Sequence, residues 1–124
     1  MRCCLVVTPE AMRARTKKFA VDVIKLAKQV PRNAINDEIT AQLTDAASST
    51  AAAYRSACRA RSKADFIYKL GNAIEEADES ALWMEILVDA EIWTVTPVKQ
   101  LLQEADELTR ILVASRETAR GNRR

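Results

Sequence analysis

"SSTAAAYRSACRARSKADFIYKLGNAIEEADES", residues 48–80, contains two helical patterns separated by a short polar turn. Before the turn, apolar and small residues recur at steps of three or four, which places them along one side of a helix. After the turn, Ser62 and Asp65 have the spacing of a capping box, so a new helix is expected to begin there. The stretch therefore predicts a helical hairpin with its turn near residues 60–62.

Two more helical patterns flank this hairpin. Thr8 and Thr96 each precede a proline, a combination typical of an N-cap followed by the first helical residue, and Pro31 ends the first pattern. Short connections make successive helices antiparallel neighbours. The predicted fold is an all-α, antiparallel up-down-up-down four-helix bundle in one domain, residues 1–124, with helices at about residues 9–30, 34–60, 63–92 and 97–119.

Composition agrees with a helical protein. Apolar residues make up 48% of the 124 residues and charged residues 29%, with two glycines and three prolines. The longest apolar run near the start, residues 3–7, is far shorter than the ~20 residues that cross a bilayer. We therefore expect no membrane association and a cytoplasmic location.

The absence of histidine from the sequence restricts the possible chemistry. Di-iron sites in helix bundles combine carboxylates with histidines, and a nucleophile triad needs a base. The cysteines Cys3, Cys4 and Cys58 lack metal-binding spacing, so they are expected to be reduced thiols. Acidic residues 75–79 spread around a helix and are expected to face water. We expect no enzymatic activity, metal or cofactor.

Charge is distributed unevenly along the chain. One end of the predicted bundle consists of residues 1–20, 50–72 and 110–124. This end contains fifteen of the nineteen Lys and Arg residues but only three of the seventeen Asp and Glu residues. The net charge of that end is +12, and that of the remaining residues is −10. A basic end of this kind attracts polyanions.

Clustered cations at this end are candidate phosphate ligands, although some have a structural alternative. Arg55 is placed equally well to pair with acids of a neighbouring helix, and Arg59 could pair with Asp65 across the turn. Arg61 and Lys63 at the turn itself are the most exposed candidates. The candidate nucleic-acid-binding residues are Arg13, Arg15, Lys17, Lys18, Arg55, Arg59, Arg61, Lys63, Arg116 and Arg120.

The third helical pattern is apolar on more than one side. One stripe of apolar residues along this helix is enough to face the core of the bundle. The apolar residues on its other side need a second surface to cover them. Either a wide intrachain core covers them, or a second subunit does, since tryptophan is enriched at interfaces. The candidate interface residues are Trp83, Ile86, Leu87 and Trp93.

The hairpin quoted above, together with "LWMEIL", resembles the bacterial four-helix-bundle proteins related to those encoded in intervening sequences of large-subunit ribosomal RNA. The similarity extends from about Lys17 to Ala114. The family includes the accessory variability determinants of diversity-generating retroelements, which are homopentameric barrels that bind nucleic acid and a reverse transcriptase. The resemblance thus implies a four-helix bundle and favours the subunit interface, in a ring-like homopentamer.

Two functions follow from these observations. The first is a non-enzymatic, oligomeric nucleic-acid-binding accessory protein that contacts phosphates through the basic end without base specificity, in a process involving RNA or a reverse transcriptase. The second is a protein–protein interaction scaffold whose acidic and basic ends dock other proteins.

Overall fold

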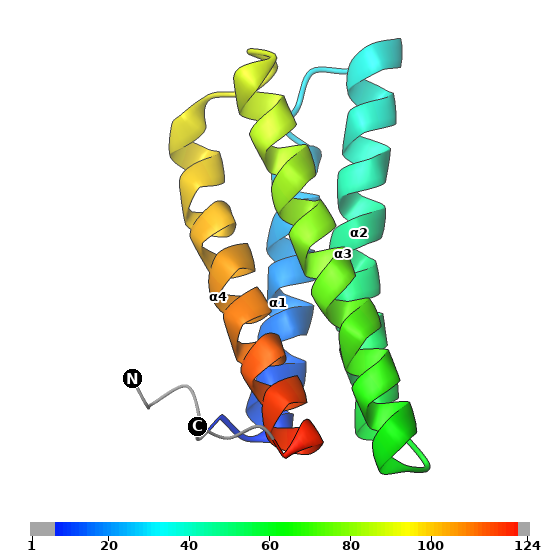
Figure 1. The fold of residues 1–124 in the computed structure, drawn as a ribbon. Coiled ribbons are helices and arrows are strands. Elements are labelled where there is room, and N and C mark those ends of the chain that lie inside the picture. The colour runs from blue at the N-terminus through cyan, green and yellow to red at the C-terminus, as the bar shows by residue number, and fades with distance from the viewer. Residues whose placement is uncertain (1–6, 122–124) are drawn as a thin grey trace.

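The structure, a computed structural model, describes residues 7–121 and consists of four helices, with no strand in that range. They are α1 (Pro9–Ala27), α2 (Ala34–Cys58), α3 (Lys63–Asp89) and α4 (Val95–Arg120). Figure 1 shows an elongated bundle in which successive helices run in opposite directions. The start of α1, the α2–α3 turn and the end of α4 lie at the same end. The prediction of an all-α, four-helix protein is confirmed.

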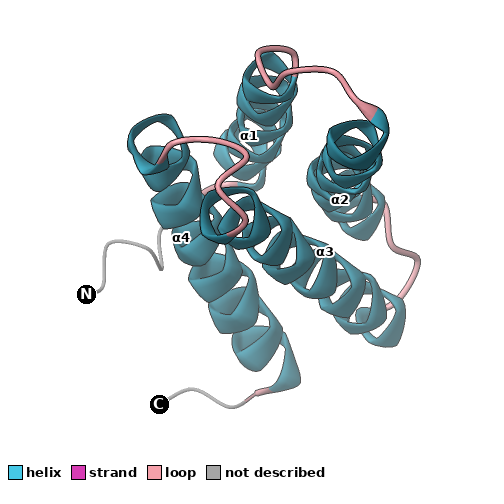
Figure 2. Cartoon of the chain, turned by 90° about the horizontal axis from the view of Figure 1, so that it is seen from above, coloured by secondary structure: helices cyan, strands magenta, loops and turns pink. Residues whose placement is uncertain are grey.

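Viewed from above, the helices form a four-cornered arrangement (Figure 2). Each helix packs against its two neighbours: α2 lies between α1 and α3, and α4 lies between α3 and α1. The packing of α1 against α4 is the sparsest of the four interfaces, whereas that of α2 against α3 is the most extensive. Few contacts therefore hold α1 against α4.

The core is built from one stripe of each helix. Its largest fully buried side chains are Phe19, Val23, Leu43, Leu70, Met84, Leu87, Val98, Leu108 and Leu112. Three buried hydroxyls lie among them, and each donates a hydrogen bond to the carbonyl oxygen four residues earlier: Thr16 to Met12, Thr50 to Ala46 and Ser80 to Glu76, at 2.9–3.0 Å. Because these hydroxyls are satisfied locally, they are tolerated in an apolar core.

Three helices begin with a side-chain cap. Thr8 Oγ1 accepts a hydrogen bond from the Ala11 amide at 3.0 Å, and Ser62 Oγ accepts one from the Asp65 amide at 3.0 Å, both as predicted. The Asp65 carboxylate does not complete a capping box; it accepts a hydrogen bond from the Arg61 amide at 3.3 Å instead. Asn33 caps α2 in the same way as Thr8 and Ser62 cap α1 and α3.

The predicted helix bounds are wrong at several ends. The first helix was expected to continue to Val30 but ends at Ala27, because the amides of Gln29 and Val30 bond to carbonyls three residues earlier and Pro31 disfavours helical geometry at Val30. The second helix ends at Cys58 rather than residue 60, and there too the following amides bond to carbonyls three residues earlier. The fourth begins at Val95, so Thr94, not Thr96, is the N-cap.

The end of α3, at Asp89 rather than residue 92, is a Schellman motif without glycine. The amide of Ile92 donates to the carbonyl of Leu87 at 2.9 Å, and the amide of Glu91 donates to that of Val88 at 3.0 Å. Glu91 adopts the left-handed conformation with φ of 61°. This geometry stops the helix early and turns the chain toward α4.

At the start of α2, Ile35 is 70% exposed, whereas Asn36 is buried and its Nδ2 donates to the Pro31 carbonyl at 2.9 Å. Cys58 is a free, half-buried thiol, whereas Cys3 and Cys4 lie outside the described residues. In residues 7–121 no helix has the length and apolarity needed to cross a membrane.

Candidate nucleic-acid interface

A groove between α1 and α2 is lined by cations that come from α1, from the end of α2 and from α3. Its volume is about 550 Å³. Five cations and no acid occur among the described residues that line it, which are Arg13, Lys17, Ala20, Val21, Ser48, Ala51, Ala52, Arg55, Ser56, Arg59 and Lys69. We refer to this feature as the basic groove.

Helical periodicity places these cations in two rows. Arg13 and Lys17 are four residues apart on α1, as are Arg55 and Arg59 at the end of α2, so each pair is separated by about 6 Å along its helix. Because α1 and α2 are adjacent and run in opposite directions, the start of one lies beside the end of the other (Figure 1). The two rows therefore flank the same section of groove.

These four cations have no carboxylate partner within residues 7–121. The predicted pair between Arg59 and Asp65 is wrong, since Asp65 pairs with Lys69. Like charges one helical turn apart destabilise a helix by a few tenths of a kcal/mol, about 0.2–0.5 per pair. The groove thus retains uncompensated positive charge that a bound polyanion would neutralise.

Lys69 is a groove cation that the sequence analysis did not assign to the site. Its Nζ lies 3.0 Å from Asp65 Oδ2, and both side chains are about 30% exposed. The hydrogen bond from Lys69 is the main cause of a pKa for Asp65 below the ordinary value. Only the packing of α3 beside α2 brings Lys69 to the groove, so no local sequence signal identifies it.

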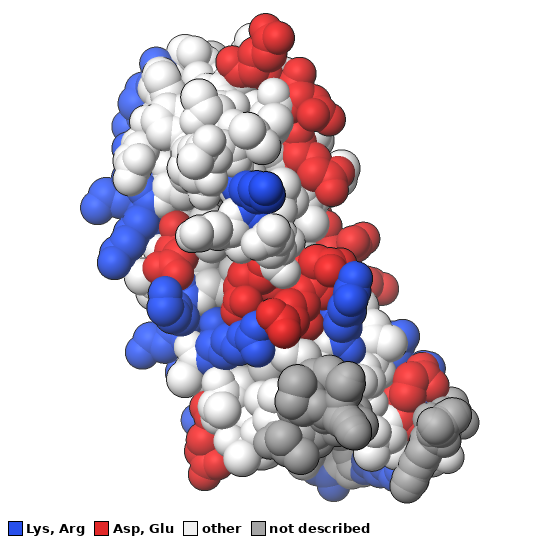
Figure 3. Space-filling model, turned by 90° about the vertical axis from the view of Figure 1, so that its left-hand side faces the viewer, with Lys and Arg blue, Asp and Glu red and all other residues white. Residues whose placement is uncertain are grey.

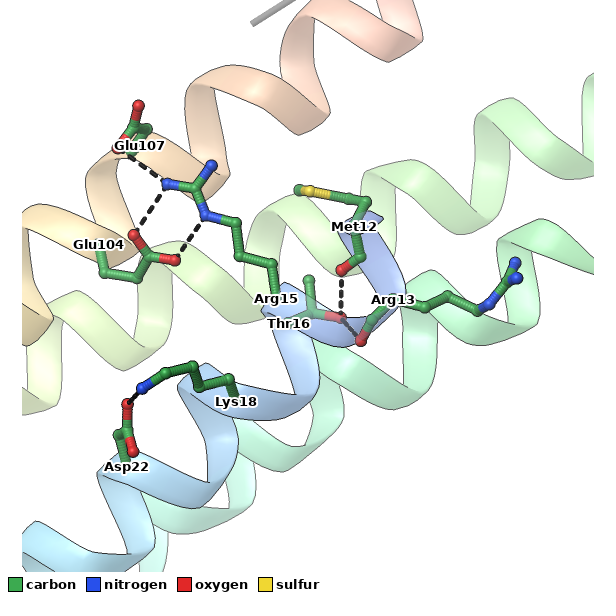
Figure 4. Close-up of polar contacts among 8 residues, drawn as sticks. All are labelled: Met12, Arg13, Arg15, Thr16, Lys18, Asp22, Glu104 and Glu107. Atoms are coloured by element: carbon green, nitrogen blue, oxygen red, sulfur yellow. Dashed lines mark hydrogen bonds and ion pairs between the residues drawn. The ribbon is translucent and has the colours of Figure 1, made fainter. Parts of the chain in front are cut away.

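Arg15, a predicted nucleic-acid ligand, holds two helices together instead (Figure 4). Its Nε and Nη2 donate to the two carboxylate oxygens of Glu104 on α4 at 2.8 and 2.9 Å, and Nη2 also donates to Glu107 at 2.8 Å. The bond to Glu104 is the main cause of a raised pKa for Arg15. Arg13, two residues away, extends away from this cluster.

We expect Arg15→Ala to lower the free energy of unfolding by about 1–2 kcal/mol, because a bidentate, partly buried pair at the sparsest interface is lost. Urea denaturation of Arg15→Ala, Glu104→Ala and the double variant measures the coupling. Nucleic-acid affinity should change little. A double variant whose destabilisation equals the sum of the single effects would show that the pair contributes no coupling.

Comparison with known proteins identifies the family. Residues 11–114 match the model of the 23S rRNA-intervening sequence protein family. The chain belongs to this family. A similar solved structure is that of a protein of unknown function from the S23 ribosomal protein family of Bacteroides thetaiotaomicron, with 26% identity, a TM-score of 0.77, and coverage of 88% of this chain and 97% of that one. No curated protein matches the sequence.

Two further candidate ligands form ion pairs within the chain, and a third is half-buried. Lys18 pairs with Asp22 at 2.7 Å and Arg120 with Glu117 at 3.4 Å. Arg116 is half-buried on α4, and its buried Nε has no hydrogen-bond partner among the described residues. Arg61 and Lys63 are exposed at the α2–α3 turn, as predicted, but do not line the basic groove.

The surface presented by α4 does not form a uniform basic patch. In Figure 3, acidic side chains follow the upper right edge of this face, basic ones follow its left edge, and both are mixed in the centre. The mixture agrees with ion pairs on this side, including Arg110 with Asp106 at 3.1 Å. Most of the cations predicted for one end of the bundle thus either form ion pairs or line the basic groove, whereas Arg61, Lys63 and Arg116 do neither. Arg2, Arg123 and Arg124 lie outside the described residues.

Most of α3 has the opposite charge. Between Lys69 and Lys99 the sequence contains seven acids and no Lys or Arg. Burial is the main cause of a raised pKa for Glu76, and the nearby charge of Glu79 adds to it. This part of α3 would therefore repel a polyanion, in contrast to the basic groove.

The candidate subunit-interface residues occupy different environments. Leu87 is fully buried in the core of its own chain, so its assignment to an interface is wrong. Leu87 lies three residues after Met84 and continues the buried stripe of α3. Trp83 and Trp93 are half-buried and pack against the core, and Ile86 is half-buried.

Proposed function

We propose that the protein is a nucleic-acid-binding accessory protein that holds phosphate groups in the basic groove. The observation that supports this most strongly is that five cations and no acid line the groove, and that four of the cations have no carboxylate partner in residues 7–121. Clustered Arg and Lys side chains bind phosphates through charge-assisted hydrogen bonds and release condensed counterions.

The groove supports recognition of the backbone rather than of the bases. No aromatic side chain is among the described residues that line it, so the groove has no surface on which a base could stack. Phosphate contacts fix the position of a nucleic acid but carry no sequence information directly. Binding is therefore weakly sequence-selective.

The same proposal includes assembly into a homo-oligomer, with a ring-like pentamer favoured by the resemblance described above. Leu82 of α3 is 49% exposed, Ile86 is half-buried, and the buried Nε1 of Trp93 has no hydrogen-bond partner among the described residues. A second subunit against α3 would cover the first two. A ring would also repeat the basic groove around one assembly, which strengthens the field that attracts a polyanion.

A second candidate function is a protein scaffold. It is favoured by the section of α3 and the α3–α4 turn that contains acids but no cations, residues 70–98, which complements a basic partner. This candidate predicts that binding depends on α3 acids such as Glu79 and Glu85 rather than on the groove.

Salt dependence tests the proposed function. Four unpaired cations that neutralise about four phosphates give a plot of log K against log salt with a slope of about −3 for a single strand. In fluorescence anisotropy from about 50 to 200 mM salt, the variant with Arg13→Gln and Arg55→Gln should flatten this slope by about 1.4. Arg110→Gln removes a cation from an ion pair on α4 and is the control, with little effect expected. Absence of affinity in wild type at about 50 mM salt would overturn the proposal.

A further inference from the structure

We propose that the basic groove binds a single strand of nucleic acid in preference to a duplex. This inference rests on the proposed function and names the class of ligand that the groove admits. It follows from the width of the groove, the size of the side chains on its floor and the arrangement of charge along it.

The width of the groove is set by two adjacent helices. Axes of packed helices are about 8–10 Å apart, so the cations on α1 and α2 face each other over a narrow space. Arg13 and Lys17 form one edge, and Arg55 and Arg59 form the other. A duplex is wider than this space and would rest on the edges, whereas one sugar–phosphate chain can lie between them.

The floor of the groove is made of small residues. Ala52 and Ser48 are exposed, and Ala51 and Ser56 are half-buried, so no long side chain of α2 fills the space between the two rows. The hydroxyls of both serines make no hydrogen bond within residues 7–121. A backbone that enters the groove can therefore approach the helices closely and meet additional hydrogen-bonding groups.

The spacing of charge sets the length of strand that the groove holds. Successive cations of each row are about 6 Å apart, comparable to the distance between neighbouring phosphates of one strand. Farther along, Asp45 lines the adjoining hollow between α1 and α2, which shares Ser48 with the basic groove. This carboxylate repels phosphate, so the favourable section is limited to a few nucleotides.

The first experiment compares an oligouridine strand with a hairpin duplex that has the same number of phosphates, by fluorescence anisotropy at about 100 mM salt. We expect the strand to bind at least about tenfold more tightly, because the duplex loses one or more charged hydrogen bonds inside the groove. Deoxyribonucleotide and ribonucleotide strands should bind alike, since the cations contact phosphates.

The second experiment fills the groove without changing its charge. Ala52→Leu should weaken binding of the single strand by about tenfold, because leucine occupies the floor while adding no surface on which a base could stack. Ala52 is exposed and leucine favours helices, so the fold is retained, which circular dichroism verifies. Ala41→Leu, also exposed on α2 but in the adjoining hollow, is the matched control and should leave affinity unchanged.

The outcomes separate this inference from the proposed function. A duplex that binds as tightly as the strand, or an Ala52→Leu variant with wild-type affinity for the strand, would overturn the single-strand inference while leaving nucleic-acid binding in place. Failure of both ligands to bind would overturn the two proposals together. Preference for the strand, lost in Ala52→Leu and kept in Ala41→Leu, would support the inference.

Discussion

Replacing Arg13 and Arg55 with glutamate is expected to lower the affinity for single-stranded RNA by about 100-fold or more. Each substitution removes a charged hydrogen bond to phosphate, worth about 1.5–3 kcal/mol, and introduces a repulsive carboxylate. Neither cation has a carboxylate partner in the described residues, so the fold loses no ion pair. Anisotropy titrations at fixed salt measure the change.

A matched control distinguishes the groove from the basic end as a whole. Arg61→Glu with Lys63→Glu makes the same change in net charge at the exposed α2–α3 turn, outside the groove. We expect a weakening of less than about tenfold, because only long-range attraction is reduced. Equal losses in the two double variants would assign binding to diffuse charge at this end of the bundle and contradict a groove-specific site.

The second large effect concerns stability. Leu87→Ala is expected to lower the free energy of unfolding by about 2–5 kcal/mol, because truncation of a fully buried leucine leaves a cavity between α3 and its neighbours. Denaturant titration followed by circular dichroism measures this loss. The oligomeric state of the folded fraction should not change, since Leu87 lies inside its own chain.

Ile86→Ala provides the comparison on the same helix turn. Ile86 is half-buried, so its truncation should cost less stability than that of Leu87. If the chain is an oligomer through this side of α3, Ile86→Ala should weaken assembly instead, as light scattering would show. A Leu87→Ala variant that dissociates without losing stability would contradict the buried position of Leu87.

The number of helices could be predicted from the sequence because apolar residues recur at helical spacing over long segments. Helix ends were predicted less well. Pro31 suggested a helix up to Val30, whereas the last amides before it already bond three residues back. At Glu91 a non-glycine residue adopts a left-handed conformation, which no sequence rule for helix ends anticipates.

The candidate site could be predicted only in part, because ion pairs between distant segments depend on the fold. Arg13 and Arg15 are both cations of the first helix with similar local sequence, yet Arg15 binds two carboxylates of α4 and Arg13 lines the groove. The two arginines have different roles because Arg15 lies on the side of α1 that faces α4 and Arg13 does not. In the structure, some of the small residues of α2 form the groove floor.

The apolar side of α3 was open to prediction. Leu87 follows Met84 by three residues and continues the buried stripe of α3, so helical periodicity alone places it inside its own chain. Its assignment to an interface was wrong because the apolar residues near the end of this helix were treated as one surface.

Backbone amide chemical shifts measured during titration of ¹⁵N-labelled protein with a short oligouridine test the central claim most directly. If the basic groove binds the phosphate chain, the largest changes occur in residues 13–21 of α1 and in residues 48–59, at the end of α2, and they diminish as salt is raised. Two results would contradict the account. In one, the largest changes occur in the acid-rich segment of residues 75–91; in the other, they occur at the α2–α3 turn and none occurs along the groove.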